Sequence, residues 1–248
     1  MNTIADPVRG PTGTGSPATR WLGLTCLLGL GALLLFAFVV SPADDVQRDM
    51  VRMLYIHVPS AFLTYVAFGV TAVGSVMWLW RRSVWWDIVA HSSAEAGVIL
   101  CGLTLFTGSI WGRPTWGTYW EWGDVRLVTT LILFLVYVGY LSVRSLGGDD
   151  DSIATRAAVV GLIGAVNIPI VNRSVDWWFN RTLHQQSSLT DGKLEDLTLF
   201  TMFLGLVVLS ASYVWLMVHR FRLGWLEREQ RGLEIDAAIE ARRAEAMS

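Results

Sequence analysis

The stretch WLGLTCLLGLGALLLFAFVV, residues 21 to 40, decides the fold because it contains no charged residue. As a helix, a run of this length crosses the hydrocarbon core of a bilayer, which is about 30 Å thick. The run is long, lacks a small-residue cleavage site and is followed by further apolar runs, so we expect it to be retained rather than removed as a signal peptide. The chain around it is 53% hydrophobic and 16% charged, a composition typical of a polytopic membrane protein.

Five more runs have the same character. The fifth is the shortest, and we expect it to extend outward from Ile153 to reach the length of a span. The sequence therefore predicts an all-α integral membrane protein with six transmembrane helices, a tryptophan-rich outer loop and a short interfacial outer helix. The predicted spans are 21–40, 59–80, 96–112, 127–143, 157–171 and 197–218.

An even number of spans places both termini on one side of the bilayer. Twelve basic residues flank the spans on the terminal side and seven on the other, which favours cytoplasmic termini by the positive-inside rule. We expect a flexible cytoplasmic tail over 1–20, a six-helix membrane domain over 21–220 and a charged cytoplasmic helical tail over 221–248. The outer loops of that domain are then 41–58, 112–126 and 172–196.

Several function classes are disfavoured by the sequence. Cys26 and Cys101 each lie inside an apolar run and form no C-x-x-C pair, which argues against disulfide exchange and zinc binding. Without a basic patch or a glycine-rich phosphate loop, neither nucleic-acid binding nor ATP hydrolysis is expected.

The first outer segment has the pattern of an amphipathic helix. Apolar residues recur at helical spacing from Val46 to His57, and this indicates a short helix lying in the membrane interface. Pro59 disfavours helical geometry at Val58, so we expect a break there, with His57 at the bend.

The third outer segment, NRSVDWWFNRTLHQQSSL, repeats the combination of aromatic residues, a cation and a histidine. If the segment is helical, Trp177, Arg181 and His184 share one face.

The second outer segment lies within SIWGRPTWGTYWEWGDVRL, residues 109 to 127, which holds four tryptophans. One interpretation is an interfacial aromatic belt, since indole rings favour the headgroup region. The other is a site for a flat apolar ligand with carboxylates, because rings stack on such a ligand and guanidinium groups hold its acids. His57 and His184 add imidazoles, common axial ligands of heme iron, whereas His91 and His219 lie on the opposite side and are read as structural.

The motifs MLYIHVPSAF, GSIWGRPTWGTYWEWGDVRLVTTLIL and DWWFNRTLHQ, spaced along six spans, resemble the heme exporter protein C family of cytochrome c maturation. The resemblance covers about residues 21 to 220. It implies a protein of the bacterial inner membrane that binds b-type heme transiently and non-covalently and presents it to a periplasmic heme chaperone. It also implies an ABC transporter as partner, with membrane and ATPase subunits and a small membrane subunit, besides the surrounding lipid bilayer.

By the same resemblance, His57 and His184 match the axial heme ligands. The tryptophan-rich motif matches Trp116, Gly117, Trp120, Trp122, Asp124 and Arg126. Gly123 interrupts the family pattern W-x-W-D-x-R-L, and we expect a turn to absorb it. Arg126 and Arg181 are the preferred partners of the heme propionates.

No catalytic residue is identified, so we expect a delivery factor rather than an enzyme. Two alternatives stay open. One is an electron-transferring membrane cytochrome with bis-histidine heme, although such proteins usually bury their ligands inside facing spans. The other is a transporter for heme or a small solute, for which the sequence offers only Asn167, Pro169 and Glu95 as features within the spans.

Overall fold

The computed structural model describes residues 11–45, 47–184 and 196–247. Within these residues, six helices are long and apolar enough to cross a membrane, as predicted. In chain order the helices are α1 (Pro17–Leu35, extended by a π-helical turn Phe36–Val40), α2 (Leu54–Arg81), α3 (Val84–Trp116), α4 (Val125–Val143), α5 (Asp150–Trp177) and α6 (Asp196–Met247). The predicted tail residues 1–10 lie outside the described part of the chain.

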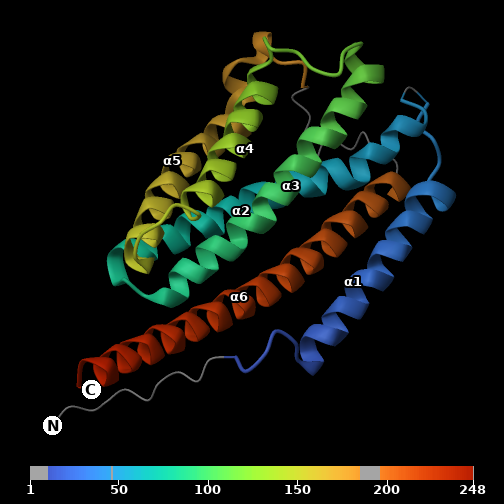
Figure 1. Ribbon diagram of the computed structural model, residues 1–248. Coiled ribbons are helices and arrows are strands. Elements are labelled where there is room, and N and C mark those ends of the chain that lie inside the picture. Colours follow the sequence, from blue (N-terminus) through green and yellow to red (C-terminus); the bar gives the residue numbers. More distant parts are fainter. Residues whose placement is uncertain (1–10, 46, 185–195, 248) are drawn as a thin grey trace.

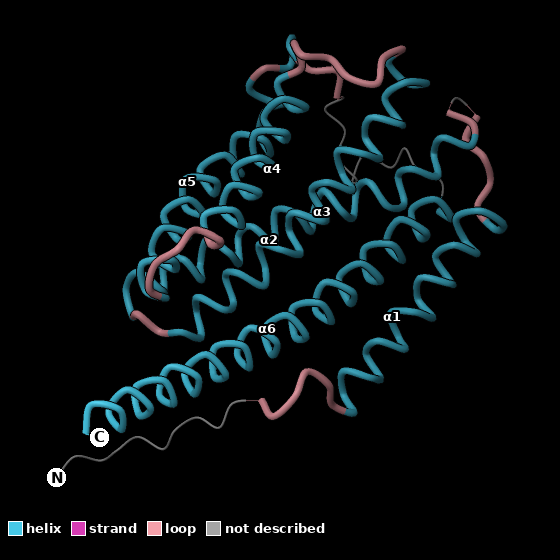
Figure 2. Tube along the Cα trace, viewed as in Figure 1, coloured by secondary structure: helices cyan, strands magenta, loops and turns pink. Residues whose placement is uncertain are grey.

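The helices form a bundle around α2. Helix α2 packs against α3, α5 and α6, while α4 joins through α3 and α5, and α1 packs on α6. Figure 1 shows the two long connections near Trp116–Val125 and Val40–Leu54 at the same end of the bundle, together with the end of α5. We call this end the tryptophan end. The tube view of Figure 2 shows that loops join the helices here.

Aromatic packing holds the centre of the bundle. The rings of Phe68 in α2 and Tyr137 in α4 stack with centroids 3.6 Å apart and planes 6° from parallel. The Tyr137 hydroxyl donates to the Gly161 carbonyl of α5 at 3.0 Å. A buried hydroxyl must find such a partner, and this one ties α4 to α5 across the apolar core.

Helix α3 begins twelve residues before the predicted start of its span. The charged residues in this added stretch form ion pairs with other helices. Asp87 is 4% exposed and receives two hydrogen bonds from Arg144, at 2.7 and 2.9 Å. Glu95 is paired with Arg220 of α6. A hydropathy pattern counts these carboxylates against a span, whereas the folded chain neutralises them with arginines from other helices.

Helix α6 runs without a break through the predicted boundary at residue 220. Its 52 residues, at 1.5 Å each, make a helix roughly 78 Å long, far more than a bilayer requires. Arg228 contacts Asp87 at 3.5 Å and Asp150 at 3.4 Å, which anchors the base of this extension to α3 and α5.

The break expected at Pro59 is wrong. A short helix does precede the second span, as predicted, but it is a 3₁₀ turn over Asp49–Met53 that continues directly into α2 at Leu54. Pro59 therefore lies inside α2, where it removes the N–H that would bond to the Tyr55 carbonyl. That carbonyl instead faces Gly205 of α6, at which a Cβ atom would lie only 2.2 Å from the Tyr55 oxygen. The missing side chain of Gly205 thus lets α6 approach the Tyr55 carbonyl.

Candidate functional site

His57 lies in the first turn of α2 and points to α3. Its Nδ1 is 3.1 Å from the Thr107 hydroxyl, and its ring meets the Trp111 ring edge to face with centroids 5.6 Å apart. Gly108 gives the ring room, because a Cβ at that position would lie 2.9 Å from His57 Cε1. His57 therefore packs against one face of α3. The sequence had predicted a bend at this residue, and the structure has none there.

His184 reaches the same end of the bundle from a different element. Helix α5 ends at Trp177, a 3₁₀ turn follows over Phe179–Arg181, and the chain then bends through Leu183 and His184. The helical face expected for Trp177, Arg181 and His184 is thus wrong, because the helix stops where that face should begin.

The His184 ring is buried against the end of α3. Its centroid lies 4.7 Å from that of Trp116, and its Nδ1 has no hydrogen-bond partner among the described residues. Burial, helped by the positive charge of Arg126, lowers the pKa of His184 to about 4. The imidazole is therefore neutral at physiological pH, the form that binds metals. Both histidines therefore contact tryptophans in the last turns of α3, His57 at Trp111 and His184 at Trp116.

The tryptophan-rich loop begins at Gly117. This residue ends α3 with φ of 82°, a left-handed conformation that favours glycine. In the loop that follows, the rings of Trp120 and Trp122 meet edge to face at 5.6 Å. Trp120 buries its indole N–H without a partner among the described residues, whereas Trp122 is 73% exposed. The loop thus has an inward and an outward tryptophan.

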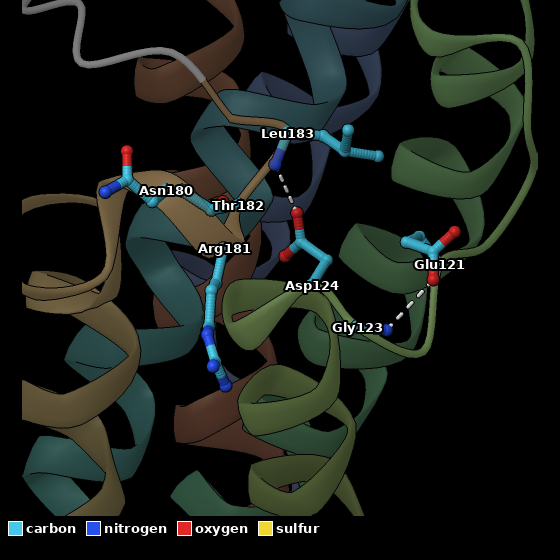
Figure 3. Close-up of a pocket in the computed structure, with 7 residues that line it drawn as sticks. All are labelled: Glu121, Gly123, Asp124, Asn180, Arg181, Thr182 and Leu183. Atoms are coloured by element: carbon cyan, nitrogen blue, oxygen red, sulfur yellow. Dashed lines mark hydrogen bonds between the residues drawn. The ribbon is translucent and has the colours of Figure 1, made fainter.

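Gly123 lies in a tight turn, as expected for an inserted residue. The Asp124 N–H donates to the Glu121 carbonyl at 3.1 Å, and Trp122 and Gly123 occupy the centre of that turn. The Glu121 side chain accepts from the Gly123 N–H at 3.0 Å (Figure 3).

Asp124 joins the loop to the histidine segment. It is 2% exposed; one carboxylate oxygen accepts from the Leu127 N–H at 2.9 Å as the N-cap of α4, and the other accepts from the Leu183 N–H at 2.5 Å (Figure 3). Both oxygens are therefore engaged by backbone amides, and the second bond places the residue that precedes His184.

The two predicted arginines occupy different environments. Arg126 donates to the Ser174 hydroxyl at 3.2 Å and to the Asn172 carbonyl at 3.0 Å, which ties α4 to α5. Arg181 is exposed, and its side chain runs beside the start of α4 (Figure 3). It lines a pocket of about 420 Å³ together with Glu121, Gly123, Asp124, Asn180, Thr182 and Leu183.

Thr107, Gly108 and Trp111 contact His57 but were not singled out from the sequence. Thr107 and Trp111 are four residues apart on α3, so they share the face that meets the histidine. Their spacing was visible, but nothing in one sequence says which residue of α2 that face meets.

Comparison with known proteins identifies the same family on independent grounds. The family model described as "Heme exporter protein C" matches residues 2–236. Heme exporter protein C of Bradyrhizobium diazoefficiens is 37% identical over 218 residues, which cover 87% of this chain and 81% of that protein. The protein of the same name from Haemophilus influenzae is 36% identical over 86% of each chain, and that of Escherichia coli K12 is 36% identical over 68% of this chain and 67% of its own.

Proposed function

The chain belongs to the heme exporter protein C family of cytochrome c biogenesis, and we propose that it binds heme between His57 and His184 and presents it to a periplasmic heme chaperone. Members of this family are transport and delivery components. The six apolar helices of this chain and its family point to a multi-pass protein of the bacterial inner membrane. Heme is therefore cargo in this proposal, held without a covalent bond and only for a time.

The observation that carries the proposal is that two imidazoles from different elements contact tryptophans at the same end of α3. His57 comes from α2 and His184 from the segment after α5, yet each ring contacts a tryptophan of the last turns of α3. Imidazole is a usual axial ligand of heme iron, and indole rings stack on a planar macrocycle. An interfacial belt needs neither the histidines nor a buried, unpaired indole N–H such as that of Trp120.

The other predicted site residues differ in what they can contact. Trp116 lies against His184, and Trp120 lies against Trp122. Trp122 itself is exposed, where an approaching partner would meet it. Arg181 is exposed at the pocket beside Asp124, where we propose that it pairs with a propionate, whereas Arg126 supplies positive charge near His184 from a fixed position. We propose that Gly117 and Asp124 act by shaping the loop and not by touching heme.

The role of Asp124 can be tested with a matched pair of helix caps. Replacing Asp124 with alanine should lower heme affinity by about 10- to 100-fold, the range found when a residue that orients a metal ligand is lost. The control is Asp149→Ala, which removes the equivalent cap of α5, a side chain that accepts from the Ser152 N–H at 2.9 Å. Each variant loses about 1 kcal/mol of capping. Equal heme affinity in the two variants, measured by heme titration, would show that Asp124 is only a cap.

We propose that both termini lie in the cytoplasm and the tryptophan end faces the periplasm. The two native cysteines are buried, so an introduced cysteine can be labelled without background. A membrane-impermeant maleimide applied to intact cells should label Glu121→Cys in the tryptophan-rich loop and not Ser145→Cys between α4 and α5. The opposite pattern would invert the topology.

Transfer to the chaperone is proposed to occur at the exposed edge of the bound heme. Trp122, Trp177 and Phe179 are 57% or more exposed and surround that end of the bundle. The chaperone would supply the group that bonds to heme, and an associated ABC transporter would supply ATP hydrolysis, so this chain contributes orientation alone. Mixing heme-loaded protein with apo-chaperone should produce covalent heme on the chaperone, detected by heme staining after denaturing electrophoresis. Heme that stays on this chain would favour the electron-transfer cytochrome.

The polar residues that a transport pathway through the spans would need form contacts between helices instead. The Asn167 amide donates to the Thr129 carbonyl at 2.8 Å and joins α5 to α4. Glu95 is paired with Arg220. These polar residues stabilise helix contacts within the bundle, so the delivery function is the better supported proposal.

A further inference from the structure

We infer that Thr107 fixes the tautomer of His57 and thereby presents the ring nitrogen Nε2 to the heme iron. The inference rests on the proposed heme-binding function and assigns a positioning residue to it. Thr107 lies on α3, is 5% exposed, and contacts His57 through its hydroxyl.

The direction of the hydrogen bond follows from where the Thr107 proton goes. A hydroxyl has one proton to donate and two lone pairs that accept. Thr107 Oγ1 lies 2.7 Å from the Leu103 carbonyl, a group that can only accept, and 3.3 Å from the Thr104 carbonyl. The proton is therefore committed to the backbone of α3, and towards His57 the hydroxyl oxygen can only accept.

His57 must then carry its proton on Nδ1, the nitrogen 3.1 Å from Thr107 Oγ1. In a neutral imidazole the other nitrogen has the lone pair, and that lone pair is what binds a metal. No described residue hydrogen-bonds Nε2. A ligating histidine commonly donates its second N–H to a fixed acceptor, which sets both its tautomer and its ring orientation.

Hydrogen bonds between α2 and α3 fix the position of Thr107 relative to His57. The Thr104 hydroxyl lies 3.0 Å from the Ser60 hydroxyl, and Ser60 donates to the His57 carbonyl at 2.9 Å. The His57 side chain therefore contacts α3 at Thr107, and α3 returns to the His57 backbone through Thr104 and Ser60. Gly108 and Trp111 confine the ring on either side of this contact.

Among the described residues, His184 has no comparable partner. Its Nδ1 is buried and unpaired there, and it lies on a bent segment and not on a helix. Of the two proposed ligands, His57 is therefore the one whose tautomer is set by a partner among the described residues.

The test compares Thr107→Val, which keeps the shape and removes the hydroxyl, with Thr107→Ser, which keeps the hydroxyl. The proteins are studied without heme and labelled with ¹⁵N-histidine. In the wild type, NMR should show His57 protonated on Nδ1. In Thr107→Val, NMR should show a mixture of the two His57 tautomers. The His57→Ala spectrum assigns the signal among the four histidines. A wild-type His57 protonated on Nε2 overturns the inference whether or not heme binds.

Heme titration gives the second readout. Thr107→Val should bind heme about 10- to 100-fold more weakly than the wild type, and Thr107→Ser should bind nearly as the wild type does. Unchanged affinity in Thr107→Val, with affinity lost in His57→Ala, would refute the role of Thr107 and leave His57 as a ligand. Unchanged affinity in His57→Ala would refute the proposed ligation itself. If Thr107→Val does not fold, the wild-type tautomer and Thr107→Ser still decide the question.

Discussion

Replacing His57 with alanine should reduce the heme that co-purifies with the protein by more than about tenfold, because loss of a ligand exceeds the loss of a residue that merely orients one. The ring is packed between Gly108 and Trp111 on α3, so its removal opens a space that no neighbouring imidazole fills. The measurement is the ratio of heme absorbance to protein in detergent-purified samples.

The matched control is His219→Ala. His219 lies against Trp215 on α6 with ring centroids 4.7 Å apart, an aromatic contact like that of His57 but near the opposite end of the bundle. This variant should retain wild-type heme. Equal heme loss in both variants would mean that removal of any packed histidine damages the protein, and wild-type heme in His57→Ala would remove that residue from the iron.

Gly205→Ala should be strongly destabilising, because among the described glycines an added Cβ makes its shortest contact here. The added methyl group would lie 2.2 Å from the Tyr55 carbonyl oxygen, a backbone atom that cannot rotate away. Helix α6 must shift, and overpacking of this kind costs about 1–3 kcal/mol or more. Because Tyr55 and His57 lie on the same turn of α2, the shift should lower heme content as well as the midpoint of thermal unfolding in detergent.

Gly69→Ala provides the control within α2. A Cβ atom there meets nothing within 4 Å, so alanine should be neutral or stabilise the helix by up to about 1 kcal/mol. Unfolding midpoints that fall equally in the two variants would show that α6 does not depend on close approach at Gly205.

The sequence predicted the six spans because hydropathy and length decide them. It underestimated α3, since Asp87 and Glu95 interrupt the apolar pattern and only the folded chain reveals their partners Arg144 and Arg220. It also placed a break at Pro59. A proline weakens one hydrogen bond of a helix, but packing against Gly205 and the neighbouring core residues keeps α2 continuous.

The parity of the spans predicted that the three outer segments share one face, and the structure places His57, Trp116, Trp120 and His184 at the same end of the bundle. The local geometry of the third segment could not be predicted in the same way. Its aromatic and charged residues fit a helical face, yet α5 ends at Trp177 and the Leu183 N–H bonds to Asp124, a residue 59 positions away. Contacts of that range are set by the fold, so one sequence could not reveal Asp124 as a tether.

The most direct measurement is the electron paramagnetic resonance spectrum of ferric heme bound to the purified wild type, taken with the absorption spectra of His57→Ala and His184→Ala. We predict a low-spin signal of heme with two imidazole ligands in the wild type, and its loss in both variants. A high-spin wild-type signal, or a bis-imidazole signal that survives in either variant, would contradict heme ligation by His57 and His184.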